Sequence, residues 1–329
     1  MRSSIFALSL FSLLSFSLAA CGAESAGREV GSESNVIDRP ALTTFTSDAA
    51  GFDTHSYWLD TGSEVVVFDA QFTEASAEAL LASIRKATQS RIAFVVITHP
   101  NPDKFNGAEV FRREGAKVIA SKRTAAALPG VHAYKKAYFT QVAKSFTEAT
   151  YPKLATVDVT FEGTYRLPVK GQAIELRELA NAGVSSTQTV AWLSGTKSLV
   201  VGDLVHGRAH AWLEGGIVDG APKPDLAAWQ KSLEELSQFE GARVYGGRGE
   251  VLDLDVAIRE ERTYLAEADT IVARYVADLG ARKSELSDPA KNGAHWKAIT
   301  AALVSRFPTY ALPYMVEYGV YGLALSKVK

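Results

Sequence analysis

The sequence predicts an α+β protein in which two mixed β-sheets pack together and are covered by helices, with a helical extension at the C-terminus. Short apolar strands recur in two groups, before and after Thr150, with segments of helical periodicity between and behind them. With 329 residues and 47% hydrophobic content, the chain is long enough to bury a full core. These observations favour a sandwich of two sheets over an all-helical or all-β fold.

The N-terminus has the features of a lipoprotein export signal. Met1-Arg2 is a short basic start, and the apolar run from Ile5 to Leu18 is interrupted by serines and too short to span a membrane. The run leads into Leu18-Ala19-Ala20-Cys21, which resembles the bacterial lipobox, where the cysteine is lipidated. We expect residues 1–20 to be a signal peptide and Cys21 to anchor the chain to a lipid bilayer. Residues 21–35, which are small and polar, should form a flexible tether.

The N-terminus and the charge also bear on location and partners. We expect a lipid-anchored protein of the cell envelope, in the outer membrane facing the periplasm if the host has two membranes, because Gly22 rather than aspartate follows Cys21. A formal charge of -2 and a pI near 6.3 provide no basic surface for nucleic acid, which excludes that class of partner. Since Cys21 is the only cysteine, the chain has no internal disulfide and no other thiolate for a metal.

The globular part is predicted to occupy residues 36–250. It opens with a hairpin, followed by a helix and then by the unbroken apolar or β-branched run Ile92–Thr98, which is typical of a strand buried on both faces. The expected strands are 57–59, 65–69, 92–98, 117–121, 157–161, 173–179, 189–193 and 198–201, with a helix at 76–88 and helical or irregular chain at 124–150. Because the apolar run at Ile92–Thr98 stops at a polar loop, we expect the chemistry at that end of the strand.

Residues 251–329 are predicted to be a helical extension packed on this domain. Apolar residues repeat at helical spacing from Val256 to Leu279, a second helix follows Asp288-Pro289, and a short third helix begins near Pro313. The extension either caps the sandwich or forms a homo-oligomer through the aromatic residues between Tyr310 and Tyr321.

The polar loop after the strand carries the first functional motif. Its sequence is His99-Pro100-Asn101-Pro102-Asp103-Lys104, and Asn106-Gly107 follows. This segment resembles the His-x-His-x-Asp-His signature of the metallo-β-lactamase superfamily, whose fold is a four-layer αββα sandwich. His99 and Asp103 stand where the family has its first histidine and its aspartate. Asn101 and Lys104 replace two histidines that bind metal.

The second half continues the resemblance, which covers about Phe45 to Gly249. Asp203, at the end of an apolar strand, matches the aspartate that bridges the two metals in the family. Val184 stands where a metal-binding histidine belongs, and Arg248 occupies the histidine position of the closing turn Gly246–Gly249. The family spacing is kept, but most of the ligands are replaced.

These replacements predict that the chain binds no catalytic zinc and needs no other cofactor. Zinc requires three or four nitrogen, oxygen or sulfur donors, and two permanent cations beside a dication repel it. We therefore expect Lys104 and Arg248 to fill the metal's space, within salt-bridge distance of Asp103 and Asp203, so that neither carboxylate is buried without a partner.

The remaining candidate side chains have ordinary structural interpretations. His206 and His210 have a spacing that would place both on one helical face, but we expect them to be loop residues near the cleft mouth. Trp229 is predicted to pack in the core. For Trp212, core packing and substrate contact are equally compatible with the sequence. His55, just before Tyr57-Trp58, is expected at the surface or at a strand edge, and His132 and His295 lie in helical stretches without companion ligands.

Two classes of function follow. The favoured class is a pseudoenzyme or binding protein that uses the vestigial cleft, with Lys104 and Arg248, for structure or for a small anionic ligand. The alternative is an active hydrolase of a lactone, ester or thioester. It would use an atypical zinc set of His99, Asp103, Asp203 and His206, or work without metal with Asp103 or Asp203 as the base. Family hydrolases generate their nucleophile by lowering the pKa of metal-bound water, so the number of ligands separates the two classes.

Overall fold

The computed structural model describes residues 42–328. The predicted signal peptide, Cys21 and the tether lie outside these residues. The described residues belong to one compact unit, so the C-terminal helices are part of the same body as the sheets. Between residues 42 and 328, no helix has the length and apolar character needed to cross a membrane.

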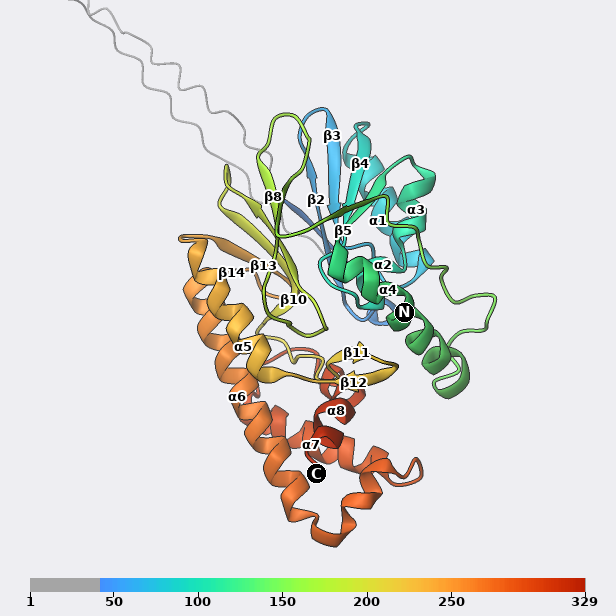
Figure 1. The fold of residues 1–329 in the computed structure, drawn as a ribbon, viewed down its shortest axis with the longest axis vertical. Coiled ribbons are helices and arrows are strands. Elements are labelled where there is room, and N and C mark those ends of the chain that lie inside the picture. Colours follow the sequence, from blue (N-terminus) through green and yellow to red (C-terminus); the bar gives the residue numbers. More distant parts are fainter. Residues whose placement is uncertain (1–41, 329) are drawn as a thin grey trace, which may run out of the picture. The chain divides into compact units, whose positions relative to one another are not determined.

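Two six-stranded mixed sheets form the centre of the molecule (Figure 1). The first contains, in spatial order, β1 (Thr43–Thr46), β2 (His55–Asp60), β3 (Glu64–Phe68), β4 (Arg91–Val96), β5 (Lys117–Ser121) and β6 (Val159–Phe161). The second contains β14 (Leu252–Asp253), β13 (Arg243–Gly249), β10 (Ser198–Gly207), β9 (Thr189–Leu193), β8 (Ile174–Glu178) and β7 (Thr164–Arg166). A separate hairpin pairs β11 (Gly216–Val218) with β12 (Ala221–Lys223).

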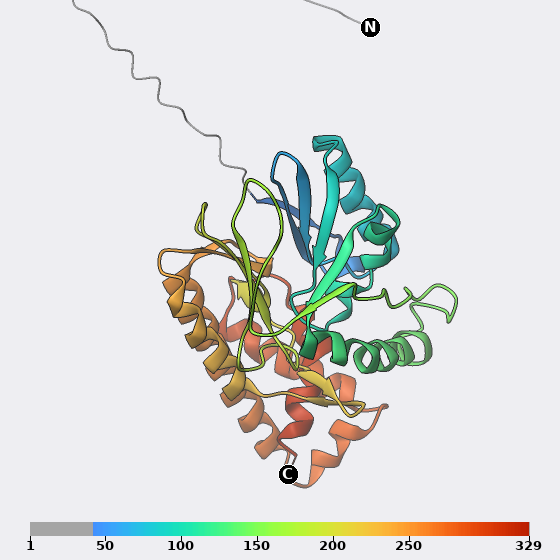
Figure 2. The same cartoon turned by 45° about the horizontal axis from the view of Figure 1, so that its top comes forward.

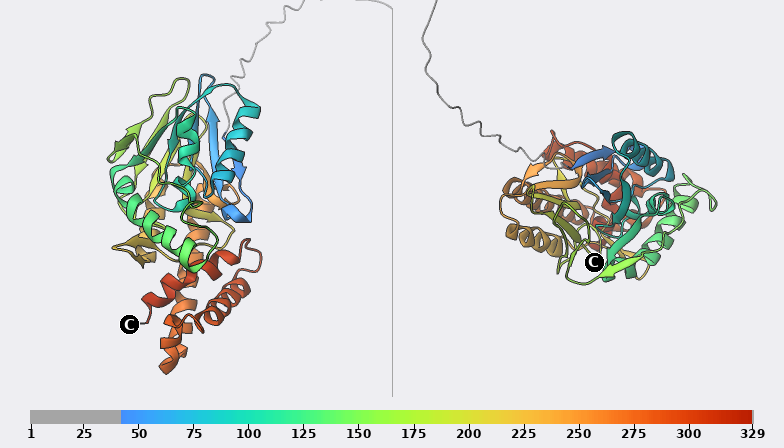
Figure 3. Two further views of the ribbon diagram at one scale, coloured as in Figure 1. Left: turned by 90° about the vertical axis from the view of Figure 1, so that its right-hand side faces the viewer. Right: turned by 90° about the horizontal axis from the view of Figure 1, so that it is seen from above.

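Helices cover the outer face of each sheet, as the view from above in Figure 3 shows. The helices on the side of the first sheet are α1 (Glu74–Ala87), α2 (Pro102–Phe105), α3 (Ala108–Arg113) and α4 (Lys122–Ala137). Those on the side of the second sheet or below it are α5 (Leu226–Glu235), α6 (Leu254–Asp278), α7 (Asn292–Arg306) and α8 (Tyr314–Ser326). A π-helical turn at Tyr138–Val142 extends α4.

Figure 2 shows the two sheets and the helices that cover them as successive layers. Separate apolar clusters fill the spaces between these layers. One lies between the first sheet and its helices and includes Leu80 and Phe111. A second, with Phe68 and Leu176, joins the two sheets. The third lies between the second sheet and the C-terminal helices and includes Leu265. The predicted αββα sandwich is therefore confirmed.

Burial on both faces explains why the sequences of the central strands are apolar without interruption. In β3, Val65 and Val67 pack with the helices, whereas Val66 and Phe68 pack with the second sheet. The residues of β4 divide between the same two clusters, so the strand predicted at Ile92–Thr98 is buried on both faces. It ends at Val96, and the next residues lead directly into the functional loop.

The helical extension continues from the second sheet. Helix α6 packs along β10, and α7 and α8 extend below the sandwich, as the left view of Figure 3 shows. Gly322 permits α8 to approach the chain after β10 closely, because a Cβ there would lie 2.1 Å from the carbonyl oxygen of Glu214. The predicted helix at Val256–Leu279 agrees with α6 to within two residues at either end.

Several short elements were not predicted, namely β1, β7 and the β11–β12 hairpin. Each has only three or four residues, too few for a periodic signal. In the segment 124–150, the π-helical turn buries Phe139 and leaves Val142 69% exposed.

Candidate functional site

The site lies where β4, β10 and β13 bring their C-terminal ends together. The loop after β4 carries His99 and Asn101, and α2 then presents Asp103 and Lys104. On the second sheet, β10 and β13 are parallel neighbours, and their register shifts between Gly202 and His206, where Asp203 lies. Only glycine fits at position 247, because a Cβ there would lie 1.8 Å from Asp203 Oδ1.

Four side chains form a closed ring of charges, which we call the ion-pair ring. Lys104 Nζ lies 2.7 Å from Asp103 Oδ2 and 2.8 Å from Asp203 Oδ1. Arg248 Nη1 lies 2.7 Å from Asp203 Oδ2, and Arg248 Nη2 lies 3.1 Å from Asp103 Oδ2. The predicted salt-bridge contacts are therefore present. Two carboxylates and two cations alternate, so the ring carries no net charge.

The ring is almost completely withdrawn from solvent. Lys104 is fully buried, and Asp203 and Arg248 are only 1% and 2% exposed. Burial opposes the ionisation of both carboxyl groups, but the nearby positive charges outweigh it. Lys104 and Arg248 thus hold the pKa of Asp103 below its usual value and that of Asp203 well below it. In the same way, the two carboxylates overcome burial and raise the pKa of Lys104. All four groups remain charged at neutral pH.

Arg248 also fixes the loop that covers the ring. Its Nε donates to the carbonyl oxygen of Phe52 at 2.9 Å, and its Nη2 donates to Thr54 Oγ1 at 2.8 Å. Phe52 has a φ of 62° and Asp53 a φ of 48°, a left-handed conformation that is uncommon for these residue types. The guanidinium therefore helps to hold a strained turn in place, including the backbone from which the Phe52 ring extends.

His99 lies beside the ring as a neutral imidazole. Its Nε2 is 3.7 Å from Asp203 Oδ2 and has no hydrogen-bond partner within residues 42–328. Burial lowers the pKa of His99 to about 4. Behind it, Nδ1 lies 3.0 Å from Thr98 Oγ1, and that hydroxyl donates to Asp69 Oδ2 at 2.9 Å. Burial raises the pKa of Asp69 to about 7.

These residues do not fit a zinc site. His99 Nε2 is an available nitrogen donor, but both carboxylates are engaged by cations that lie where a metal would have to lie. Val184 is buried in the third apolar cluster and offers no donor. Within residues 42–328 no group of three or more histidine, cysteine, aspartate or glutamate side chains is placed to hold a metal ion.

The atypical set of His99, Asp103, Asp203 and His206 is not assembled. His206 lies in β10, where Glu261 Oε2 accepts from its backbone nitrogen at 2.9 Å and Glu261 Oε1 lies 3.4 Å from Nδ1. Glu261 thus holds the Nδ1 side of the imidazole against α6, while Nε2 has no hydrogen-bond partner among the described residues. Within residues 42–328 the four side chains are not placed as a group that could hold a metal ion.

His206 and His210 were expected to be loop residues near the cleft mouth, and the structure places only His210 in a loop, because His206 lies in β10. Both are buried, and His210 Nδ1 lies 3.1 Å from Tyr264 OH in the interface with α6. Long-range packing of the helical extension covers both residues, and their spacing along the chain gives no signal of this.

The other candidates do not join the site as ligands. His55 Nε2 lies 3.0 Å from the carbonyl oxygen of Gly249. His132 Nε2 lies 2.8 Å from the carbonyl oxygen of Pro152, and His295 Nδ1 lies 2.8 Å from Tyr275 OH on α6. Trp229 is a core residue, as predicted, and its Nε1 donates to the carbonyl oxygen of Leu204 at 2.9 Å. Trp212 is half-buried and lines the cleft.

A cavity of about 30 Å³ lies above the ring. Asn101, Asp103, Lys135, Asp203 and Arg248 provide its polar lining, and the remaining wall is mostly apolar: Phe52, Phe72, Phe139, Trp212 and Met315. The carboxamide of Asn101 makes no hydrogen bond to another group in the described chain, so it is the one uncommitted polar side chain of this lining among those residues.

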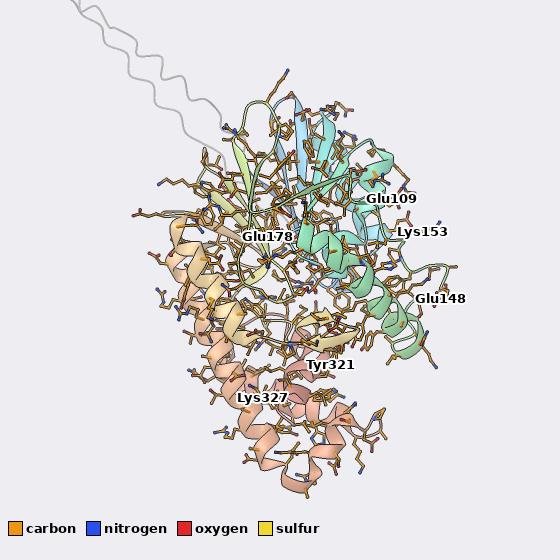
Figure 4. The ribbon with its side chains drawn as sticks, in the orientation of Figure 1. Glu109, Glu148, Lys153, Glu178, Tyr321 and Lys327 are labelled. Carbon is orange, nitrogen blue, oxygen red and sulfur yellow. The ribbon has the colours of Figure 1, made fainter. Side chains whose placement is uncertain are left out.

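A second buried ion pair in the cleft wall was missed by the sequence analysis. Lys135 of α4 pairs with Glu214, which also accepts from Trp212 Nε1 at 2.7 Å and from the hydroxyl of Tyr321. Tyr321 is labelled on α8 in Figure 4. Lys135 is 5% exposed and Glu214 is 1% exposed. Because the partners come from distant segments, no local motif marks them.

Comparison with known proteins assigns the family. The sequence model of the metallo-beta-lactamase superfamily matches residues 49–248, which is more than half of the chain. The chain belongs to this superfamily. The match agrees with the resemblance found from about Phe45 to Gly249, and the ion-pair ring lies inside it.

Individual relatives are distant. A beta-lactamase-like protein 2 homolog of Caenorhabditis elegans is 24% identical over 201 residues, which cover 61% of this chain and 57% of the relative. The chain thus spans little more than half of that protein. A metallo-beta-lactamase from Pontibacter korlensis superposes with a TM-score of 0.52 at 21% identity, over 69% of this chain and 99% of that one. The TMB-1 structure gives 0.51 at 18% identity, over 70% and 99%. These structures support the fold alone.

Proposed function

We propose that this chain is a metal-independent binding protein of the superfamily, in which the ion-pair ring takes the place of the zinc ions. One observation carries the proposal: Lys104 Nζ lies within 2.8 Å of both metal-site carboxylates. A cation at that point neutralises Asp103 and Asp203 as a metal would, and it leaves no position between them for one.

The chemistry of the ring favours binding over hydrolysis. Enzymes of this family obtain their nucleophile from metal-bound water, and the donor set here does not fit the metal. Asp103 and Asp203 would be weak general bases, because their pKa values are lowered by the adjacent cations. Lys104 would be a poor nucleophile, because it stays protonated between two carboxylates.

The charge balance also bears on the ligand. Both cations of the ring are already paired, so an anion entering the cleft would have to compete with Asp103 and Asp203 for them. The free carboxamide of Asn101 is neutral, and most of the remaining cleft wall is apolar. These features favour an uncharged ligand over the anionic ligand expected from the sequence.

The decisive experiment measures metal binding in two proteins. We expect the purified chain to contain well under about one equivalent of zinc and to keep its melting temperature when zinc or chelator is added. The positive control is the variant with all four replaced positions restored (Asn101→His, Lys104→His, Val184→His, Arg248→His), which should bind zinc and gain thermal stability with it. Stoichiometric zinc in the parent protein would refute the proposal.

We further propose that Cys21 anchors this binding protein to the envelope membrane, and that Gly22 directs it to the outer membrane of a two-membrane host. The lipobox sequence supports this. In the native host, Cys21→Ser should abolish lipid labelling and release the protein from the membrane fraction. Equal membrane association of the variant and the parent would contradict the anchor.

A further inference from the structure

A second cavity, of about 440 Å³, adjoins the cleft. It shares Phe52, Phe72, Phe139 and Trp212 with the cleft and is extended by Tyr138, Phe146 and Tyr318. We call it the aromatic cavity. No charged side chain of the described chain lines it. Its volume lies in the range of about 300–1,000 Å³ that is common for small-molecule sites.

The rings around this cavity form an apolar cluster separate from those between the layers. Phe72 and Phe139 are buried, with ring centroids 5.0 Å apart, but Phe52 and Phe146 are only partly covered. The cluster therefore leaves aromatic surface facing an open volume that the protein does not fill. An apolar molecule in that volume would remove this surface from water and gain contacts that the walls now lack.

Two unusual backbone segments contribute to the wall of the aromatic cavity. The π-helical turn Tyr138–Val142 supplies Tyr138 and Phe139, and such turns occur often at functional sites. Phe52 supplies a further ring from a left-handed backbone conformation, and its carbonyl oxygen accepts a hydrogen bond from Arg248. The ion-pair ring is thus connected to the cavity, because it helps to hold the backbone from which the Phe52 ring extends.

We propose that the aromatic cavity is the ligand site of this protein and that it takes a small, uncharged, apolar molecule. This inference rests on the proposed binding function. Because no charged side chain of the described residues lines the cavity, an ionic ligand would lose its hydration there without gaining an oppositely charged partner. The shared wall places one end of such a ligand beside the cleft and the other at the rim near Tyr318.

Two probes with the same ring system test this ligand class. N-phenyl-1-naphthylamine is uncharged, and 1-anilino-8-naphthalenesulfonate carries a sulfonate on the same skeleton. Both become fluorescent in apolar surroundings. We expect the full-length protein to bind the neutral probe saturably, at about one site, and at least about tenfold more tightly than the anionic probe.

A matched pair of variants tests whether the probe binds in the aromatic cavity. Ala143 is exposed at the rim and lines the cavity, so Ala143→Trp should fill it and weaken neutral-probe binding at least about tenfold. Ala79 is exposed on α1 and does not line the cavity, so Ala79→Trp should leave the affinity unchanged. Circular dichroism and the melting temperature establish that both variants are folded.

Three results would overturn the inference. Binding of the neutral probe by Ala143→Trp as tight as in the parent would place the probe elsewhere. Equal affinity for the anionic probe would refute the ligand class. If the protein self-associates and the probe no longer binds, a second copy of the chain occupies the rim instead of a small ligand. Val142 and Tyr318, near this rim, are 69% and 51% exposed. The zinc measurement is independent of all three, so a failure of the metal-free proposal is distinguishable from a failure here.

Discussion

Arg248 and Arg208 each bridge two carboxylates, and mainly their surroundings differ. Arg248 lies between Asp103 and Asp203, and only 3% of its side chain is exposed. Arg208 lies between Glu250 and Glu260 at distances of 2.9 and 3.0 Å, with 42% of its side chain exposed. The contacts are equally short, but those of Arg208 are open to water, whereas those of Arg248 are almost completely withdrawn from it.

Burial, rather than the number of ion pairs, decides how much a charged side chain contributes to the stability of the fold. Around Arg208, solvent screens each charge and solvates it when a partner is removed. Around Arg248, removal of one partner leaves another charge in a medium that cannot solvate it. The Lys135–Glu214 pair is an intermediate case, because Glu214 has further hydrogen-bond donors if the lysine is lost.

The largest expected effect is that of Arg248→Ala. The change leaves Asp203 and Asp103 with one shared cation and releases the turn at Phe52, so we expect the free energy of unfolding to fall by about 3 to 5 kcal/mol. Urea unfolding followed by circular dichroism measures it. Arg248→Lys, which keeps the charge but loses the planar fork, should recover part of the loss. Unchanged stability in Arg248→Ala would mean that the ring does not hold the two sheets together.

A matched pair of lysine variants sharpens the comparison between the two buried clusters. Lys104→Met removes the cation shared by two carboxylates and should cost about 2 to 4 kcal/mol. Lys135→Met should cost less, about 1 to 3 kcal/mol, because Trp212 and Tyr321 still donate to Glu214. The same urea titration compares them. A larger loss in Lys135→Met would reverse the ranking and make the Glu214 cluster the main polar support of the cleft.

A third prediction uses pH to examine a buried polar group outside the ring. Burial lowers the pKa of His210 to about 4, below the usual value of 6.5. The unfolded chain therefore binds more protons in this range, so the stability that neutral His210 contributes is present above pH 6.5 and is lost as the pH falls toward 4.

Replacing this histidine should make the protein less sensitive to acid. We expect His210→Gln to reduce the slope of unfolding free energy against pH, between pH 6.5 and 4, by up to about 1.4 kcal/mol per pH unit. Urea unfolding at a series of pH values gives both slopes. If the two slopes coincide, His210 is not buried as a neutral group.

The smallest expected effect is that of Arg208→Ala. Because its carboxylate partners Glu250 and Glu260 are accessible to water, we expect the unfolding midpoint to stay within experimental error at moderate salt. Repeating the measurement at low and high salt provides the check, since any contribution should shrink as salt is added. A loss as large as that of Arg248→Ala would contradict the role assigned to burial.

Local sequence patterns were sufficient to predict the layers of the fold and the residues that line the cleft. The apolar run at Ile92–Thr98 required a strand covered on both faces, and the family spacing aligned His99, Asp103 and Asp203 with a metal site. Charge alone then required Lys104 and Arg248 to approach those carboxylates, since a buried carboxylate without a cation is costly. These inferences succeeded because each depended on neighbours in the chain or on a spacing that the fold preserves.

Other features depended on contacts between segments far apart in the chain. His206 and His210 became interior residues only because α6 packs over them, and Glu214 meets Lys135 and Tyr321 across separate elements. The aromatic cavity likewise joins Phe52, Phe139 and Tyr318, whose spacing carries no period. Packing in three dimensions decides which of these side chains meet and how much water remains beside them, and a one-dimensional pattern encodes neither.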